Sequence, residues 1–307
     1  MDQDDRKAPL VTVYIPTKNR LRLLQRAVNS VLAQTYDEIE LVVVDDCSAD
    51  GTREYLQAMV AEQKLTAILM TASGGACAAR NLAIRSARGR FVTGLDDDDY
   101  FKPDRIKGFV DKWLALDQDE VSNRIAGLFD GQILLRHDRT RRLANRPKVT
   151  FRNLKLGNLI GNQVFAPRDH YIGAGLFDPE MPCWQDWDLW LRLAKVHGDF
   201  VGCGNWSYVF DIGSAADRVS CRPEGLIRDG FRRMIVKHGP YTWRERYGPI
   251  NAIADYPQVM LSLQETLILA SFGGFWKVLK KALRRIFGDS LYLYLRDFQF
   301  GYQRKQP

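Results

Sequence analysis

The sequence has few of the features that mark secreted, zinc-binding or membrane-spanning proteins. Its five cysteines are odd in number and include no Cys-x-x-Cys pair, which disfavours a disulfide framework or zinc site and favours a reducing cytoplasmic setting. The first nine residues are charged and carry no apolar segment, so we expect no signal peptide. The most apolar late stretch, residues 259–276, is interrupted by Gln264 and Glu265, whereas a spanning helix needs roughly 20 apolar residues. We therefore expect a soluble or peripheral protein.

Excess positive charge is absent from most of the chain. The 307 residues carry 44 Lys and Arg against 37 Asp and Glu, a net charge of +7. Residues 271–307 contribute +6 of this, which leaves +1 for the first 270 residues. This asymmetry argues against a nucleic-acid-binding protein and makes the basic character a property of the C-terminal segment. The length favours about two domains, or one large α/β domain with an appendage.

The first hundred residues alternate between predicted strands and predicted helices. We expect strands at residues 11–15, 39–44, 65–70 and 91–95. Helices are expected over residues 21–32, from the break at Asp50-Gly51 to about residue 64, and over residues 76–87. This alternation predicts an α/β fold with a mostly parallel sheet and flanking helices. Ligands of such sheets bind beyond the carboxyl ends of the strands, which here means the loops at residues 16–20, 45–51, 72–80 and 96–99.

The remaining chain is less periodic. We expect strands at residues 125–129 and 163–166 and a helix over residues 186–196. Residues 222–272 are predicted to form several helical pieces, broken at Gly239-Pro240 and at Gly248-Pro249.

Four consecutive aspartates, Asp96 to Asp99, follow the predicted strand at residues 91–95. Adjacent carboxylates repel one another, and a bound cation offsets that repulsion. Carboxylate oxygens suit Mg²⁺ or Mn²⁺, which take one or two carboxylates together with substrate phosphates. The alternative is a solvated acidic turn before a helix, but the position at a strand's carboxyl end favours a functional site.

Two other loops carry candidate ligand-binding residues. Asp45 and Asp46 can accept hydrogen bonds from a nucleobase or a ribose, or can serve only in the loop and helix cap. The small-residue turn at residues 74–81 lets the backbone approach a ligand closely, and its Arg80 can pair with a phosphate. This turn has neither the GxGxxG pattern nor the P-loop pattern.

Asp186 lies within the tryptophan-rich segment of residues 184–192. A helix that starts near Asp186 would direct its carboxylate toward a cleft, beside the indoles of Trp184 and Trp187. Aromatic groups next to a carboxylate form a sugar-sized pocket and raise the pKa of a general base. The competing interpretation is an N-cap aspartate on a helix with a tryptophan-rich core.

The order of these motifs resembles that of family 2 glycosyltransferases, which are inverting enzymes with the GT-A fold. The matching segments are IPTKNR (15–20), VDDCSADGT (44–52), ARN (79–81), GRFV (89–92), LDDDD (95–99), GAGLFD (173–178) and QDWDLWLR (185–192). The resemblance spans roughly residues 10–210. We therefore expect a GT-A nucleotide-sugar-binding and catalytic domain over residues 1–215 and a helical C-terminal extension over residues 216–307.

The resemblance also implies roles for the matching residues. The nucleotide-sugar ligands are expected to be Pro16, Thr17, Arg20, Asp45, Asp46, Arg80, Asp96 and Asp97. Mn²⁺ or Mg²⁺ is expected on Asp98, with Asp99 as a second ligand because four aspartates allow more than one register of the DxD element. Asp186 matches the general base, although Gln185 stands where relatives often have Glu. Arg218 and Ser220, in a polar loop, are candidates for closing over the diphosphate.

The basic C-terminal segment contains a predicted amphipathic helix over residues 275–287. Its apolar face is expected to consist of Phe275, Trp276, Leu279, Leu283, Ile286 and Phe287. Such a helix can lie on an anionic membrane surface, pack on the catalytic domain or bind a partner helix. The resemblance to bacterial O-antigen transferases implies a UDP-hexose donor, glucose or galactose. It implies an undecaprenyl-diphosphate-linked sugar acceptor, O-antigen or surface polysaccharide biosynthesis, and peripheral attachment to the inner face of the cell membrane.

Other classes explain fewer of these features. A metal-dependent phosphotransferase of the haloacid dehalogenase type needs Thr or Val four residues after its aspartate, whereas Tyr100 holds that offset from Asp96. A nucleotidyltransferase is a further metal-dependent alternative. A receiver domain explains Asp45 and Asp46 but not the second acidic cluster. A non-enzymatic basic membrane adaptor has no need for the acidic loops.

Overall fold

The computed structural model describes residues 8–118, 122–136, 139–212, 223–287 and 303–304. It begins with β1 (Val11–Thr17), α1 (Leu21–Leu32), β2 (Ile39–Asp45), α2 (Thr52–Ala61), β3 (Thr66–Leu69), α3 (Gly75–Ser86) and β4 (Phe91–Gly94). The predicted alternation of strands and helices is therefore confirmed, with small differences at the element ends. One of these differences is that β1 continues through Pro16 and pairs with β2 as far as Thr17.

The first sheet has the strand order β3-β2-β1-β4-β9, in which β1 to β4 are parallel and β9 (Ala166–Pro167) is antiparallel to β4. Successive side chains of β1 point to opposite faces. Val13 and Ile15 pack in the layer that contains α1 and α2, while Tyr14 packs in the layer that contains α3. Thr17 is paired with Asp45, so the carboxyl ends of β1 and β2 lie side by side.

A second, mixed sheet adjoins the first and follows the order β11-β7-β6-β10-β5. Its strands are β5 (Tyr100–Phe101), β6 (Ile125–Arg136), β7 (Arg139–Arg142), β8 (Lys148–Val149), β10 (Asp199–Asp211) and β11 (Gln303–Arg304), with β8 paired to β10. The long strands β6 and β10 run parallel. Sequence patterning predicted only the first five residues of β6 and missed β10, because Gly202, Gly204 and Asn205 interrupt the apolar pattern of β10.

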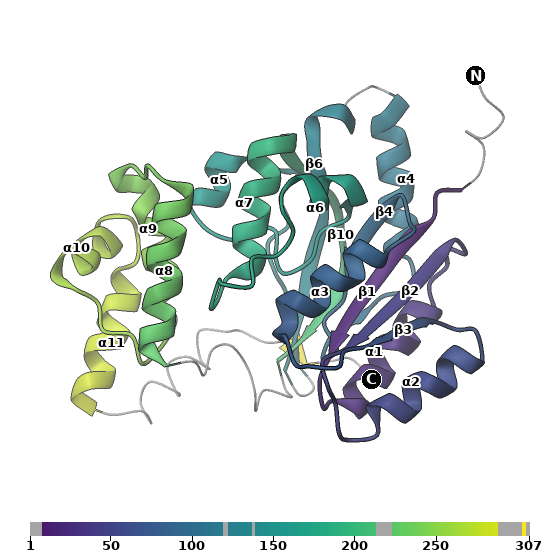
Figure 1. Cartoon of the computed structure of the whole chain (residues 1–307). Helices are drawn as coiled ribbons and strands as arrows, with labels where there is room; N and C mark the ends of the chain where they lie inside the picture. Colours follow the sequence, from purple (N-terminus) through teal and green to yellow (C-terminus); the bar gives the residue numbers. More distant parts are fainter. Residues whose placement is uncertain (1–7, 119–121, 137–138, 213–222, 288–302, 305–307) are drawn as a thin grey trace.

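The remaining helices form the centre and one side of the molecule (Figure 1). They are α4 (Arg105–Gln118), α5 (Phe151–Lys155), α6 (Arg168–Gly173), α7 (Gln185–His197), α8 (Glu224–His238), α9 (Trp243–Ala254), α10 (Leu263–Ser271) and α11 (Phe275–Phe287). The predicted break at Gly239-Pro240 is confirmed, but the one at Gly248-Pro249 is wrong, since Pro249 lies inside α9. Gly248 lies against the backbone of residues 155–156, where a side chain would have no room.

Helices α8 and α9 are joined to α7 and α5 by buried polar contacts. Asp188 of α7 is fully buried and accepts hydrogen bonds from His238 Nε2 (2.8 Å) and Arg192 Nη2 (2.7 Å). Lys155 of α5 donates to Glu245 Oε2 across 3.1 Å. Among the residues that the structure describes, no helix is both long enough and apolar enough to cross a membrane. The predicted domain boundary at residues 215–216 lies outside the described residues.

Candidate active site

A pocket of about 790 Å³ lies beyond the carboxyl ends of β1, β2 and β4, beside the start of α3. This volume is typical of small-molecule sites, which measure roughly 300–1,000 Å³. The predicted residues that line it are Pro16, Thr17, Arg20, Asp46, Arg80, Asp96, Asp97 and Asp98. Lys18, Asn19, Ser73 and Phe210 also line it and were not predicted individually.

Asp96 is held by three side chains from two parts of the chain. Arg80 Nη2 lies 2.9 Å from Asp96 Oδ1, and Gln163 Nε2 lies 3.2 Å from the same oxygen. Asn162 Nδ2 donates to Asp96 Oδ2 across 2.8 Å. The carboxylate therefore occupies a fixed position at the pocket wall, and Arg80 is oriented by it. Asn162 and Gln163 were missed because isolated amide residues form no recognisable sequence pattern.

Asp97 and Asp98 both pair with the side chain of Arg20, which lies in the loop after β1. Arg20 Nη1 lies 3.0 Å from Asp97 Oδ1 and 3.1 Å from Asp98 Oδ2. Thr17 Oγ1 donates to Asp97 Oδ2 across 2.8 Å. Burial raises the pKa of Asp97 to about 6, although Arg20 and Thr17 both act to lower it.

The carboxylates at the pocket wall suit a divalent cation held jointly by protein and ligand. Within the described ranges, no three His, Cys, Asp or Glu side chains converge in a way that could hold a metal ion by themselves. Mg²⁺ and Mn²⁺ sites usually use one or two carboxylates together with substrate phosphates. Asp98 and Asp96 both line the pocket and provide such oxygens.

Asp99 occupies a different position from the one predicted for a second metal ligand. It is fully buried and does not line the pocket. Its Oδ2 accepts a hydrogen bond from the Tyr208 hydroxyl (2.7 Å), and its Oδ1 accepts one from the Asp211 backbone N–H (2.9 Å). Burial, together with the charges of Asp96 and Asp98, raises the pKa of Asp99 well above its usual range. Asp99 thus connects the acidic loop to β10.

Asp45 and Asp46 also differ from each other in position. Asp45 is buried outside the pocket, where it accepts hydrogen bonds from the Ser48 backbone and from Arg53 Nε (2.9 Å). Asp46 lines the pocket and accepts hydrogen bonds from the Gly74 N–H (2.7 Å) and the Ser73 hydroxyl (2.9 Å). Asp45 therefore stabilises the loop, whereas Asp46 is the member of the pair that lines the pocket.

Asp186 lies in the first turn of α7. Trp184, the residue before this helix, has the left-handed backbone conformation (φ 56°). Loss of hydration raises the pKa of Asp186 to about 6. Trp187 and Trp190 are buried in the core, so only Trp184 remains partly exposed near this carboxylate. The tryptophan-rich segment thus serves mainly as core, and α7 begins one residue before Asp186.

Residues 158–163 connect Asp186 to Asp96. Asn158 Nδ2 donates to Asp186 Oδ2 across 2.9 Å and to the Gly161 carbonyl across 3.0 Å. That carbonyl also accepts from Trp190 Nε1 (2.8 Å), and the next residue, Asn162, holds Asp96. One short loop therefore positions both carboxylates. The candidates Arg218 and Ser220 lie outside the described residues.

Comparison with known proteins assigns the chain to a known family. Residues 12–170 match the family described as "Glycosyl transferase family 2", and the chain belongs to that family. It is similar to WcaA of Escherichia coli (strain K12), a glycosyl transferase assigned to colanic acid biosynthesis. The two are 36% identical over 238 residues, which cover 75% of this chain and 81% of WcaA. The chain spans less than half the length of several other curated relatives.

Solved structures establish the fold as GT-A. S. aureus TarS 1–349 in complex with UDP-GlcNAc matches with a TM-score of 0.55 and 20% identity, over 92% of this chain and 75% of that chain. The mannosyltransferase PcManGT from Pyrobaculum calidifontis, in complex with GDP-Man and Mn²⁺, matches with a TM-score of 0.54 and 18% identity. That match covers 96% of this chain and 80% of that chain.

Proposed function

We propose that the chain is an inverting, metal-dependent hexosyltransferase of bacterial surface polysaccharide biosynthesis, with O-antigen as one candidate product. It transfers glucose or galactose from a UDP-sugar to an undecaprenyl-diphosphate-linked sugar. The observation that carries the proposal is the loop of residues 158–163, which contacts the pocket carboxylate Asp96 through Asn162 and Asp186 through Asn158. The colanic acid assignment of WcaA and the nucleotide-sugar complexes of TarS and PcManGT support it.

The donor is expected in the 790 Å³ pocket. Thr17 and Asp46, at the ends of β1 and β2, are suited to the nucleoside, and Asp96 to the ribose. Asp98 would hold Mn²⁺ or Mg²⁺. When bound, such an ion stabilises the negative charge that develops on a departing diphosphate. Arg20 keeps the Asp98 carboxylate at the pocket wall.

Asp186 is suited to be the general base. Inversion needs one displacement, in which an acceptor hydroxyl attacks the anomeric carbon from the face opposite the diphosphate, through an oxocarbenium-like transition state. The hydroxyl proton must leave during attack, and a carboxylate with a pKa of about 6 can accept it near neutral pH. The hydrogen bond from Asn158 Nδ2 to Asp186 Oδ2 holds this carboxylate in place.

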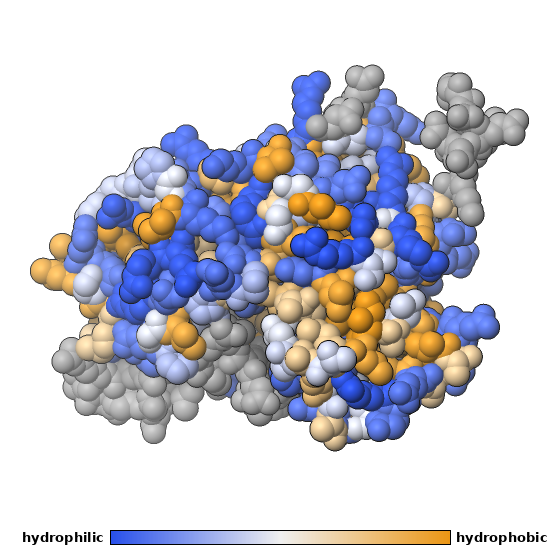
Figure 2. Space-filling view, viewed as in Figure 1, coloured by the Kyte–Doolittle hydropathy of each residue, from blue (hydrophilic) through white to orange (hydrophobic). Residues whose placement is uncertain are grey.

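Helices α10 and α11 provide the proposed membrane contact. Phe275 and Trp276 of α11 are 59% and 64% exposed, and Leu263 and Leu267 of α10 are also exposed. Figure 2 shows apolar side chains at the outer edge of this region, over α10. We propose that these residues enter the interface of the inner membrane leaflet, where the lipid-linked acceptor resides.

The orientation of two lysines of α11 differs from the simple amphipathic expectation. Lys277 contacts Asp255 Oδ1 (2.6 Å) and the Asn251 carbonyl (3.1 Å). Lys281 donates to the carbonyls of Tyr256 and Val259, both at 2.8 Å. These two charges fasten α11 to the end of α9. The proposed attachment therefore rests on exposed apolar side chains more than on these lysines.

The test is a donor panel measured by calorimetry with the full chain. UDP-glucose, UDP-galactose, UDP-GlcNAc and GDP-mannose are titrated with Mn²⁺ and again with EDTA. We expect metal-dependent binding of a UDP-hexose, followed by its transfer to an undecaprenyl-diphosphate-linked amino sugar. Absence of binding by every nucleotide sugar in the presence of Mn²⁺ would favour the non-enzymatic adaptor instead.

A further inference from the structure

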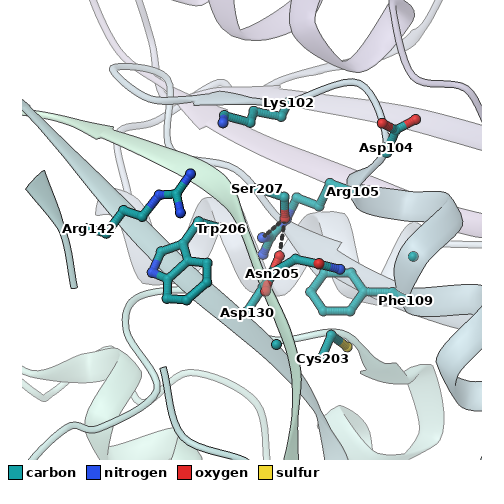
Figure 3. A pocket seen from close by; sticks show the side chains of 12 residues that line it. Lys102, Asp104, Arg105, Phe109, Asp130, Arg142, Cys203, Asn205, Trp206 and Ser207 are labelled. Carbon is teal, nitrogen blue, oxygen red and sulfur yellow. Dashed lines mark hydrogen bonds between the residues drawn. The ribbon is translucent and has the colours of Figure 1, made fainter. Parts of the chain in front are cut away.

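A second pocket, of about 390 Å³, lies between the start of α4 and the strands β7 and β10. It shares no lining residue with the donor pocket. Figure 3 shows the side chains of Lys102, Arg105, Arg142, Trp206 and Ser207 around it. Its volume is at the lower end of the range for small-molecule sites, roughly 300–1,000 Å³, which suits a single sugar ring with one substituent.

Three basic and two acidic side chains line this pocket. Lys102 and Arg142 are exposed at its rim, and Arg105 is 3% exposed within it. Lys102 makes no side-chain hydrogen bond or ion pair within the described part of the chain. The pocket also adjoins the N-terminus of α4, a 14-residue helix whose first backbone N–H groups favour a negatively charged ligand.

Arg105 is only partly satisfied by the protein. Its Nη1 donates to Ser207 Oγ across 3.0 Å, and its guanidinium lies among the rings of Phe101, Phe109 and Tyr208. Its Nε atom is buried and has no hydrogen-bond partner among the described residues. An unpartnered buried donor is unfavourable, and a bound acceptor at this position would remove the cost.

The two acidic residues of the pocket already have partners. Asp104 Oδ1 accepts a hydrogen bond from Thr35 Oγ1 across 2.9 Å. Asp130 accepts hydrogen bonds from Ser207 Oγ and from the backbone N–H of Gly131. The donors to both carboxylates are neutral groups, so the balance of charge comes from the residues themselves. Three basic residues line the pocket against two acidic ones, and this excess favours an anion.

Trp206 adds an apolar surface beside the charges. Its Nε1 donates to the Leu143 carbonyl across 2.8 Å, which fixes the indole, and the Arg142 guanidinium lies 5.0 Å from a ring centroid of this indole. An indole face beside cations is suited to a sugar ring that carries an oxyanion.

We propose that this pocket binds an acidic sugar unit, a pyranose that carries a carboxylate or a phosphate. The ring would lie near Trp206 and the oxyanion between Lys102, Arg105 and Arg142. The site is adjacent to the catalytic region through β10. Ser207 lines this pocket, whereas the hydroxyl of the next residue, Tyr208, holds Asp99.

The test measures binding by calorimetry with the full chain, so it does not depend on glycosyl transfer. The probes are D-glucuronic acid, glucose 1-phosphate and neutral D-glucose, each titrated with and without saturating UDP and Mn²⁺. We expect the two anionic sugars to bind and glucose to bind at least about tenfold more weakly, because charge-assisted hydrogen bonds are lost. The tighter of the two anionic probes identifies the carboxylate or the phosphate as the natural group.

Two rim substitutions locate the site without disturbing the buried Arg105. Lys102→Ala and Arg142→Ala should each weaken anionic-sugar binding by about tenfold. Arg141→Ala, the neighbouring residue of β7 that does not line the pocket, should leave it unchanged. Equal binding of glucose, competition by UDP, or unchanged affinity in both rim variants would each overturn the proposal, as would no binding of either anionic sugar.

Discussion

The side-chain amide of Asn158 donates a hydrogen bond to Oδ2 of Asp186 across 2.9 Å. The same amide holds the Gly161 carbonyl, so the position of the carboxylate depends on the loop that also holds Asp96. Because the amide stabilises the charged form of Asp186, it affects both the geometry and the protonation of the proposed base.

The first prediction concerns the pH dependence of Asp186. Its pKa of about 6 means that kcat/KM should rise as pH increases through about 6, as the base loses its proton, and level off above. Asn158→Ala removes a hydrogen bond to the charged form, so the pKa should rise and the ascending limb should move up by about one pH unit. UDP release measured between about pH 5 and pH 9 tests this. An ascending limb at the same pH in Asn158→Ala would show that Asn158 does not affect the pKa of the base.

The second prediction concerns turnover in Asp186→Asn. The amide cannot accept the acceptor's proton, so kcat should fall by about 10²- to 10⁴-fold. Donor affinity should change little, because Asp186 does not line the donor pocket. Steady-state turnover assays measure kcat, and calorimetry with a UDP-sugar measures the donor affinity. Near-normal kcat would show that another group is the base.

The third prediction separates the two neighbouring aspartates Asp98 and Asp99. Asp98→Ala should weaken Mn²⁺-dependent UDP-sugar binding by at least about tenfold, with little change in melting temperature. Asp99→Ala should instead lower the unfolding free energy by about 2 kcal/mol, because the Tyr208 hydroxyl and the Asp211 N–H lose their acceptor. If Asp99→Ala kept its stability and lost metal-dependent binding, Asp99 would be a metal ligand after all.

The fourth prediction concerns the buried contact between α7 and α8. Burial alone would raise the pKa of Asp188, but hydrogen bonding from His238 and the charges of Arg192 and Lys237 outweigh it and lower the pKa to about 2. Because the folded-state pKa is depressed, the stabilisation is present above about pH 4 and is lost as pH falls toward 2.

At neutral pH, Asp188→Asn should therefore cost about 2 kcal/mol, since it removes a fully buried carboxylate that accepts hydrogen bonds from Arg192, Lys237 and His238. Urea denaturation at about pH 7 and at about pH 3 measures the difference, which should shrink at the lower pH. Asp229→Asn is the matched control, because the ion pairs of Asp229 within the described residues are surface pairs with Arg232 and Arg233. Equal destabilisation by the two variants would contradict the role of Asp188.

The fifth prediction concerns membrane attachment. The double substitution Phe275→Ser with Trp276→Ser should strongly reduce flotation with anionic vesicles, because it removes the exposed apolar side chains of α11. Val236→Ser on α8, which removes an even more exposed apolar side chain from another helix, should float like the parent. Unchanged flotation of the double variant would exclude α11 as the contact.

The sequence predicted the elements whose signal is local. The apolar runs of β1 and β2 and the acidic loop after β4 identify the parallel sheet and the edge at which the 790 Å³ pocket lies. The sequence predicted a helix that starts near Asp186, and Asp186 lies in the first turn of α7. These features are visible because neighbouring residues in the chain determine them.

Features that depend on distant pairing were not visible. Four adjacent aspartates look equivalent in sequence. Contacts with Tyr208 and Asp211, more than 100 residues later in the chain, hold Asp99 in the interior. Asn158 and Asn162 act through contacts with Asp186 and Asp96, which the fold alone brings together. Strand β10 carries two glycines and an asparagine and is ordered by pairing with β6.

The contact between Asp188 and His238 has a consequence for engineering this enzyme. A chimera that exchanges C-terminal helices between relatives would naturally be cut near residue 215, before α8 begins. That junction would import a foreign α8 and deprive Asp188 of His238 and Lys237, although Asp188 lies only two residues from the proposed base in the same helix. A junction after α9, beyond Ala254, keeps both this pair and the contact between Lys155 and Glu245 within one parent, and makes α10 and α11 the exchangeable unit.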